Sequence, residues 1–305
     1  MSANPQYKVS ATSLNLRSEP LVRPGNRITG LPNGQTVTKL GVAADPEWWQ
    51  VSTTVQSAPV TGFVAKKHLK PIASFTPPAT VSGITAVHLA ENRPNNTRDD
   101  PGRRAFPLGE SGRPRRQGST AAARAASLAA IIDWLGVNTR ARYRPGSGKT
   151  YCNIYAYDYC YLAGVYIPRV WWKRTAIHTL AQGGSVAPVY GATVTELNAN
   201  ALYNWFVEYG THFGWQRTFS LTDLQNSANQ GGVGIICAQR TDLERSGHIT
   251  AVVPETGAHQ AVRSAAGVTR PLQSQAGVNN FKYGMIPRTW WANAQFAHHG
   301  FWTHA

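Results

Sequence analysis

Residues 7–72 consist of short apolar runs separated by residues that favour turns. Runs of four or five residues are typical of strands rather than helices. Proline, glycine and asparagine at 24–26 and 31–34 interrupt the pattern between runs. Strands this short at this spacing predict a small all-β barrel in a first domain of residues 1–72. The runs are 14–17, 37–41, 48–51 and 61–64.

The pattern changes to a helical period after residue 119. Ser119 or Thr120 can cap the start of a helix, and Gly136 can end it. Apolar residues between them recur three and four positions apart, so they share one face. The sequence therefore predicts a helix whose buried face is formed by Leu128, Ile131, Ile132 and Leu135.

A second helix is predicted directly after a glycine-containing loop at 146–150, which we expect to be flexible. Cys152 follows this loop, and an apolar, helix-compatible segment continues to Gly164. This layout places Cys152 in the first turn of the helix. Unpaired N–H groups and the positive end of the helix dipole favour a thiolate there, and nucleophilic thiol chemistry needs a thiolate.

The rest of the chain places helices before strands. Residues 195–209 and 224–230 read as helices, whereas 233–238 and 248–253 are strand-like. This order is typical of an α+β domain, which we assign to residues 119–305. Residues 73–118 have no sustained period and are rich in proline, glycine and arginine, so we interpret them as a linker, part of which packs along the next domain.

Charge is the most unusual feature of the composition. The formal net charge of +15 predicts attraction to polyanions, such as nucleic acid, an anionic membrane surface or the acidic polymers of a bacterial wall. Much of this charge lies in one run near the linker, and a solvated basic loop explains the run as well as a binding patch does. The run comprises Arg103, Arg104, Arg113, Arg115 and Arg116.

Other composition signals concern the compartment. No stretch approaches the roughly 20 apolar residues of a membrane helix, so we expect no membrane insertion. The N-terminus lacks the charged and apolar regions of a secretory signal peptide. Three cysteines do not make a disulfide framework. We therefore expect the chain to be made in a reducing compartment.

Three cysteines compete for the role of nucleophile. Cys237 lies inside an apolar run, and Cys160 lies two turns along the helix from Cys152, so both are expected to be buried apolar residues. Cys152 stands at a junction of loop and helix, where we expect it to be exposed. A glycine-and-lysine phosphate loop at 146–150 is rejected, because Tyr143 occupies the position of its first glycine.

A base for the thiol is predicted at His248. This histidine follows Gly247 and begins a strand, so its ring can project from the sheet toward a helix end. The alternative, a purely structural histidine, weakens once the helix-borne cysteine is considered with it. The histidines at 298, 299 and 304 have no cysteine or carboxylate at ligand spacing, so we expect no metal site.

The N-terminal pattern resembles a bacterial SH3 domain. The resemblance is carried by residues 14–18, 31–35, 48–51 and 62–64, in that order. Such domains commonly attach enzymes to cell-wall peptides, which is what the resemblance implies here. Trp48 and Trp49 are neighbours on one strand, so one is expected in the core and the other outside it.

Residues 120–285 resemble the papain-like cell-wall cysteine peptidases and amidases of the NlpC and CHAP group. The resemblance is carried by residues 150–153, 162–168, 247–249 and 252–254. It implies a papain-like catalytic domain with a Cys–His pair at Cys152 and His248 and a third polar residue that orients the imidazole. The third residue is assigned to Gln275. Glu255, Asn279 and Asn280 remain alternatives.

The resemblance implies a peptidoglycan hydrolase that cleaves an amide bond without metal or organic cofactor. Delivery to the wall would follow phage lysis or injection as an antibacterial effector, and an effector implies a cognate immunity protein. A non-catalytic wall-binding adaptor is the alternative, and a nucleic-acid binder is disfavoured because no motif supports it. The residues predicted to contact substrate are Tyr151, Asn153, Trp171 and Trp172.

Overall fold

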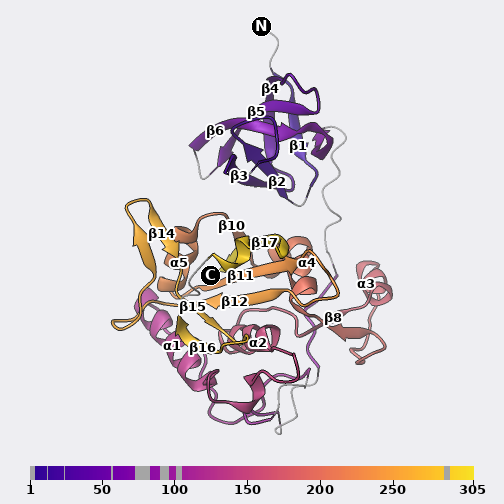
Figure 1. The fold of residues 1–305 in the computed structure, drawn as a ribbon. Helices are drawn as coiled ribbons and strands as arrows, with labels where there is room; N and C mark the ends of the chain where they lie inside the picture. Colours follow the sequence, from indigo (N-terminus) through magenta and orange to yellow (C-terminus); the bar gives the residue numbers. More distant parts are fainter. Residues whose placement is uncertain are drawn as a thin grey trace. The chain divides into compact units, whose positions relative to one another are not determined.

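The chain forms two compact units, Met1–Thr80 and Val81–Ala305. A computed structural model describes residues 4–11, 13–23, 25–55, 58–72, 83–89, 96–100, 105–284 and 289–305. Each unit is described by itself (Figure 1). The division falls inside the predicted linker of residues 73–118. We expected the second domain to begin at residue 119, but Ile84, Val87 and Leu108 of the predicted linker belong to the core of the second unit.

The first unit is an antiparallel β structure. Its described strands form one sheet in the order β3-β2-β6-β5-β4-β1-β7. Trp49 packs against its apolar core, 4.8 Å from the ring of Tyr7, whereas Trp48 lines a surface cavity of about 380 Å³. The strands are β1 (Gln6–Val9), β2 (Ser13–Arg17), β3 (Arg27–Pro32), β4 (Thr36–Val42), β5 (Trp48–Val55), β6 (Ala58–Ala65) and β7 (Leu69–Pro71), with a 3-10 turn η1 (Lys66–His68) between the last two.

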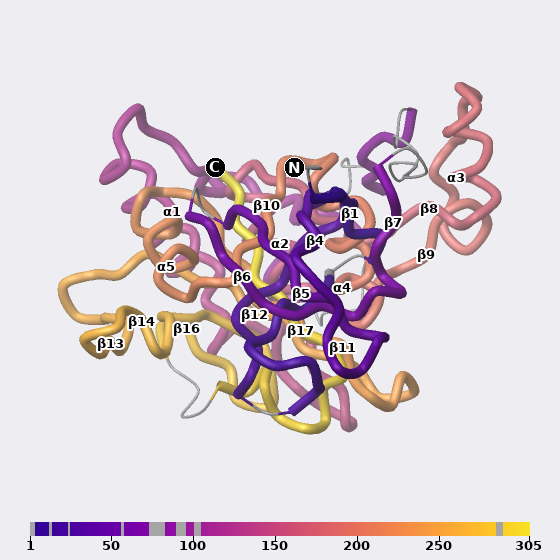
Figure 2. The backbone as a smooth tube through the Cα atoms, turned by 90° about the horizontal axis from the view of Figure 1, so that it is seen from above, coloured from indigo at the N-terminus to yellow at the C-terminus, as the bar shows by residue number. Residues whose placement is uncertain are grey.

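The second unit is a mixed α/β structure around an antiparallel sheet. The order of the described strands in this sheet is β10-β17-β11-β12-β15-β16. Two two-stranded sheets, β8–β9 and β13–β14, lie at opposite ends of the unit (Figures 1 and 2). The strands are β8 (Val170–Trp172), β9 (Val194–Glu196), β10 (Gln216–Thr218), β11 (Val233–Arg240), β12 (His248–Val252), β13 (Val262–Ser264), β14 (Gly267–Arg270), β15 (Gln273–Gln275), β16 (Phe281–Gly284) and β17 (Phe296–His304).

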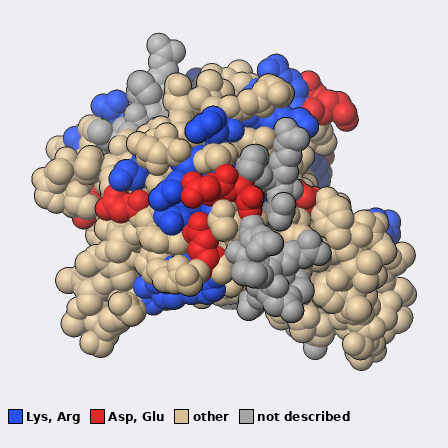
Figure 3. Space-filling view, turned by 90° about the horizontal axis from the view of Figure 1, so that it is seen from below, with Lys and Arg blue, Asp and Glu red and all other residues tan. Residues whose placement is uncertain are grey.

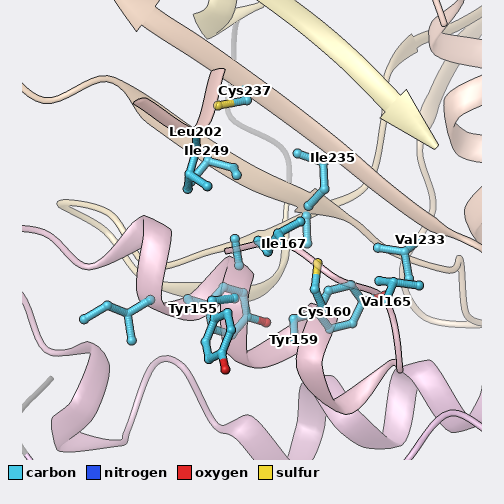
Figure 4. Packing of buried hydrophobic residues seen from close by; sticks show 14 of the residues in the cluster. Tyr155, Tyr159, Cys160, Val165, Ile167, Leu202, Val233, Ile235, Cys237 and Ile249 are labelled. Atoms are coloured by element: carbon cyan, nitrogen blue, oxygen red, sulfur yellow. The ribbon is translucent and has the colours of Figure 1, made fainter. Parts of the chain in front are cut away.

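The helices of this unit pack on both faces of the sheet. The strand β11 is apolar and buried from Val233 to Ala238 because its alternate residues enter two different cores. Ile235 and Cys237 face α2 and α4, whereas Ile236 and Ala238 face α5. Figure 4 shows Tyr155, Tyr159 and Cys160 of α2 beneath Val233 and Ile235. The helices are α1 (Ala121–Leu135), α2 (Cys152–Leu162), α3 (Arg174–Ala181), α4 (Ala199–Glu208) and α5 (Leu221–Asn229), and the 3-10 turns are η3 (Ala141–Tyr143), η4 (Gly210–Phe213) and η5 (Trp290–Ala292).

Capping residues set the helix boundaries. Thr120 caps α1, its hydroxyl accepting a hydrogen bond from the Ala123 N–H at 3.1 Å, and Gly136 ends the helix with a φ of 56°. Both were predicted, as was the start of α2 at Cys152. The helix predicted over 195–209 begins later, at Ala199. Asn198 caps this helix, and Thr195 lies outside it, paired with Trp171 in the two-stranded sheet β8–β9.

Two arginines of the predicted basic run bind backbone carbonyls. Arg115 donates to the Tyr161 carbonyl at the end of α2, and Arg116 donates to the carbonyls of Gly231 and Ala305. Arg103 and Arg104 lie outside the described residues. On the face drawn in Figure 3, basic and acidic side chains lie side by side rather than in one basic patch. None of the described helices has the length and apolar character that crossing a bilayer requires.

Candidate active site

The loop before Cys152 is a tight turn, not the flexible segment that we expected. Gly146 and Lys149 exchange two backbone hydrogen bonds, at 2.9 and 3.1 Å. Between them Ser147 has a φ of 51° and Gly148 a φ of 70°. Positive φ at both central residues is the geometry of a type I′ turn, which glycine adopts without steric cost. The turn ends at Lys149, three residues before α2 begins at Cys152.

Cys152 begins α2 and lies against the sheet. The helix packs on β12 and β15, and residue 152 is only 2% exposed. Our expectation of an exposed thiol is therefore wrong. The cause is that the N-terminus of α2 is covered by β12, whose Ile249 N–H hydrogen-bonds the Cys152 sulfur. All three cysteines are buried and unbridged.

His248 begins β12 where that strand leaves a loop. Gly247 directly before it touches β11 and α4. A Cβ atom at this position would collide with the Ala238 carbonyl oxygen and lie 2.5 Å from Asn200 Oδ1. Asn200 also holds the loop, its amide donating to the Leu243 and Arg245 carbonyls. Only glycine therefore lets the loop approach closely enough to place His248 at the sheet edge.

We expect Gly247→Ala to reduce both stability and any activity that depends on His248. Relief of the collision with backbone atoms requires the start of β12 to move, at a cost of about 1–3 kcal/mol. Urea unfolding of the variant measures this loss. The matched control is Gly257→Ala, because a Cβ atom there meets nothing within 4 Å. Equal stability of the two variants would contradict this account of Gly247.

Gln275 fixes the orientation of the imidazole. The Gln275 amide nitrogen donates to the Asn279 carbonyl at 3.0 Å, so its Oε1 faces His248. His248 Nε2 lies 2.7 Å from that oxygen and must donate its proton to it. The Nδ1 atom is then the one left for the thiol. The antiparallel pairing of β12 with β15 brings these two residues together across 27 positions of sequence.

Burial and polar contacts act in opposite directions on Cys152 and His248. Burial by itself raises the pKa of the Cys152 thiol, but the hydrogen bond and charge of His248 and the N–H groups of Ile249 and Asn153 make the net pKa lower than usual. Burial lowers the pKa of His248, but Cys152 and the hydrogen bond with Gln275 raise it above its usual value. Both directions favour a thiolate–imidazolium pair.

The other two cysteines lack this environment. Burial raises the pKa of Cys160 and of Cys237 well above the ordinary thiol value. Cys237 Sγ lies 3.4 Å from the Ala199 carbonyl oxygen, to which it donates. Both residues therefore remain protonated thiols within the core, as the sequence predicted.

A cavity of about 790 Å³ lies beside His248. His248 and Gln275 line it together with Gly148 and Thr150 of the turn before Cys152. The ring of Trp290 also lines it and meets the imidazole edge-on, 4.7 Å away. Sequence reasoning missed Trp290, because no local signal connects it with His248. Trp291, its neighbour, is buried in the core.

The residues predicted to bind substrate are distributed differently. Trp171 and Trp172 are each only 5% exposed, so neither has the accessible ring that our expectation of substrate contact requires. Trp171 packs among the rings of α4 and η4, and the Trp172 ring nitrogen donates to the Thr85 carbonyl, so both faces of β8 are covered. Asn153 donates to the Leu197 carbonyl at 2.9 Å. Tyr151 is half-buried against the core.

The three alternatives for the orienting residue have other partners. Glu255 forms an ion pair with Arg263 at 2.6 Å, and the Asn279 carbonyl accepts from Gln275. Asn280 donates to the carbonyls of Val137 and Tyr143. Among the described residues, no cluster of histidine, cysteine and carboxylate side chains could hold a metal ion.

Comparisons with known proteins add little to this geometry. No protein-family model and no curated protein matches the chain. One solved structure that matches, NlpC2 from Trichomonas vaginalis, has 12% sequence identity and a TM-score of 0.22, over 92% of this chain and 70% of that chain. A TM-score of this size does not establish a shared fold. The chemistry below follows from the residues of this chain alone.

Proposed function

We propose that the second unit is a papain-like cysteine peptidase or amidase that hydrolyses an amide bond of peptidoglycan. One observation carries the catalytic part of this proposal. Cys152 at the start of α2 has a lowered pKa because His248 contacts it, and His248 is oriented by a 2.7 Å hydrogen bond to Gln275. These are the parts that thiol catalysis requires: nucleophile, base and orienting group.

The reaction follows from the protonation states. The Cys152 proton passes to His248 Nδ1, and the thiolate sulfur attacks the carbonyl carbon of the amide. His248 then protonates the leaving nitrogen, so that the C–N bond breaks and a thioester remains on Cys152. Water attacks the thioester with His248 accepting its proton, and the carboxylic acid leaves as the thiol is restored. The hydrogen bond that His248 donates to Gln275 holds the imidazole in one orientation through both proton transfers.

The start of α2 supplies donors for the oxyanion of the tetrahedral intermediate. No side chain caps this helix, whereas Thr120, Asn198 and Ser220 cap α1, α4 and α5. The first N–H groups of α2 therefore lack a side-chain cap, and among them the Asn153 N–H already bonds the Cys152 sulfur. They point along the helix dipole toward the developing negative charge, which such donors stabilise.

The choice of peptidoglycan is supported by the sequence resemblances of both units. We propose that the first unit is an SH3-like wall-binding domain, and the antiparallel strands and the cavity at Trp48 are consistent with peptide binding. The proposed route is synthesis in the bacterial cytoplasm followed by lysis or specialised export. The proposed partners are peptidoglycan and, for an effector toxin, an immunity protein.

Digestion of purified sacculi tests this function. Sacculi are incubated with the full chain or with Cys152→Ala, and the released fragments are analysed by mass spectrometry. New amide-derived termini from the wild type alone are expected, and their masses identify the bond. If both proteins bind sacculi and neither releases fragments, the hydrolase is excluded and the alternative, a wall-binding adaptor, is favoured.

The pH profile of kcat/KM tests the role of Gln275. The active pair requires a pH above the pKa of Cys152 and below that of His248, which Gln275 helps to raise. Gln275→Ala should therefore move the alkaline limb to lower pH. Gln275→Glu should move it to higher pH, because a carboxylate favours the imidazolium. An alkaline limb that is the same in all three proteins would exclude an orienting role.

A further inference from the structure

The cavity beside His248 carries two arginines that the proposed reaction does not use. Arg240 ends β11 and Arg245 lies in the loop that leads to His248, and both line the cavity. Glu244 is the one acidic residue among the described residues that line it. The cavity wall therefore has an excess of positive charge close to the reacting pair.

Neither guanidinium forms an ion pair with any residue in the described part of the chain. Burial and the charge of Arg245 lower the pKa of Arg240, and this effect exceeds the opposing effect of Asp242. The two side chains are thus close enough to repel one another. Two like charges that share one cavity wall and form no ion pair with a carboxylate favour an anion.

Arg240 is held in place before any ligand arrives. Its backbone N–H donates to Asn200 Oδ1 at 2.9 Å, and its Nε donates to the Ser246 carbonyl at 3.0 Å. Its Nη1 donates to Gln295, and the guanidinium lies 5.2 Å from the centre of the Phe296 ring. A guanidinium has five N–H donors, of which these bonds use two. The others remain for a ligand at low entropic cost.

The loop that carries Arg245 is also fixed at several points. The Asn200 amide donates to the carbonyls of Leu243 and Arg245, at 3.3 and 2.9 Å. The Thr241 N–H donates to the Gln295 carbonyl. Arg240 and His248 lie at the two ends of this loop, and the charge of Arg240 lowers the pKa of His248. A ligand between the arginines would therefore lie beside the imidazole.

We propose that Arg240 and Arg245 bind a free carboxylate of the substrate, on a residue next to the amide bond that Cys152 attacks. This inference rests on the proposed hydrolase and names the chemical class of its substrate: peptides with a carboxylate beside the scissile amide, in preference to the same peptides carrying a neutral carboxamide. The bound carboxylate also offsets the effect of Arg240 on His248. It thereby favours the imidazolium partner of the thiolate.

Calorimetric binding to the full chain with Cys152→Ala tests the proposal without turnover. Two short wall-stem peptides are compared that differ only in a carboxylate or a carboxamide beside the scissile amide. Charge-assisted hydrogen bonds predict a Kd about 10- to 100-fold lower for the carboxylate peptide. Equal Kd values, or no binding of either peptide, would overturn the proposal.

Variants in the same background show whether the two arginines cause the preference. Arg240→Gln and Arg245→Gln are each expected to bind both peptides with equal affinity. Arg245 is exposed and holds the loop only through its backbone, which Arg245→Gln leaves unchanged, so this variant tests the proposal even if Arg240→Gln does not fold. Glu244→Gln should strengthen the preference. The matched control is Arg174→Gln, because Arg174 is an exposed arginine on α3, and this variant should keep the preference for the carboxylate peptide. A preference that survives in both Arg240→Gln and Arg245→Gln would contradict the assignment.

The outcome is separable from that of the proposed function. Wild type that cleaves both peptides with equal kcat/KM would remain a cysteine hydrolase without a carboxylate site. A carboxylate preference in binding that depends on Arg240 and Arg245, with no cleavage of either peptide, would leave the site in place and exclude the hydrolase.

Discussion

Replacing His248 with alanine is expected to lower kcat/KM for hydrolysis of wall peptides by about 10⁴-fold or more. Two contributions are lost together: the base that takes the thiol proton and the positive charge that lowers the pKa of Cys152. Burial of the sulfur, the largest effect on its pKa, is then opposed only by the N–H groups of Ile249 and Asn153, so that the thiol remains protonated near neutral pH. Steady-state kinetics on a soluble peptide that the wild type cleaves measure the effect.

The double variant Cys152→Ala/His248→Ala makes this test sharper. Residues that act as a unit have strongly non-additive effects, so the double variant should be no less active than Cys152→Ala alone. His178→Ala is the control, since His178 is an exposed residue of α3. Independent, multiplying losses for Cys152 and His248 would mean that the two residues do not form one catalytic pair.

Asp158→Ala is expected to destabilise the second unit by about 3–5 kcal/mol. Asp158 lies on α2 and forms a two-pronged pair with Arg142, at 2.6 and 3.0 Å, and it also accepts from the Tyr143 hydroxyl at 2.9 Å. Both charged side chains are fully buried. The variant leaves Arg142 without a counter-charge in the core. Urea unfolding followed by tryptophan fluorescence reports the loss.

Asp133→Ala is the matched control for this prediction. Asp133 pairs with Lys282 at 2.8 Å, but their side chains are 55% and 35% exposed. Solvent screens a pair of this kind, so its loss should cost at most about 1 kcal/mol. If Asp158→Ala costs no more than Asp133→Ala, the buried pair does not stabilise the unit as its burial and geometry indicate.

Local signals in the sequence predicted the helices that position the nucleophile. The cap at Thr120, the stop at Gly136 and the apolar face between them are contained within one segment. The start of α2 at Cys152 was predicted from the apolar, helix-compatible segment that begins there, whereas the tight turn before it was not. The strand β11 was also predicted from a local signal, its continuous apolar run. The run is continuous because its residues enter cores on both faces of the sheet. The catalytic roles of Cys152, His248 and Gln275 stay predictions.

Features that depend on distant segments were missed. Trp171 and Trp172 were predicted to contact substrate, but Thr85 covers one and rings of α4 and η4 cover the other. Thr85 belongs to the stretch that we interpreted as a linker. The histidine-rich C-terminus forms β17, paired between β10 and β11. Its polar residues concealed the strand period, because strand pairing with remote segments determines its structure.

The Cys152 pKa tests the central claim, a thiolate stabilised by His248, most directly. The thiolate absorbance in the far ultraviolet is followed against pH as the difference between wild type and Cys152→Ala. Cys160 and Cys237 stay silent, because burial raises their pKa values. We predict a midpoint below the ordinary value of about 8.5, and a midpoint above that value when the same difference is taken in the His248→Ala background. A midpoint that does not respond to the loss of His248 would contradict the pair.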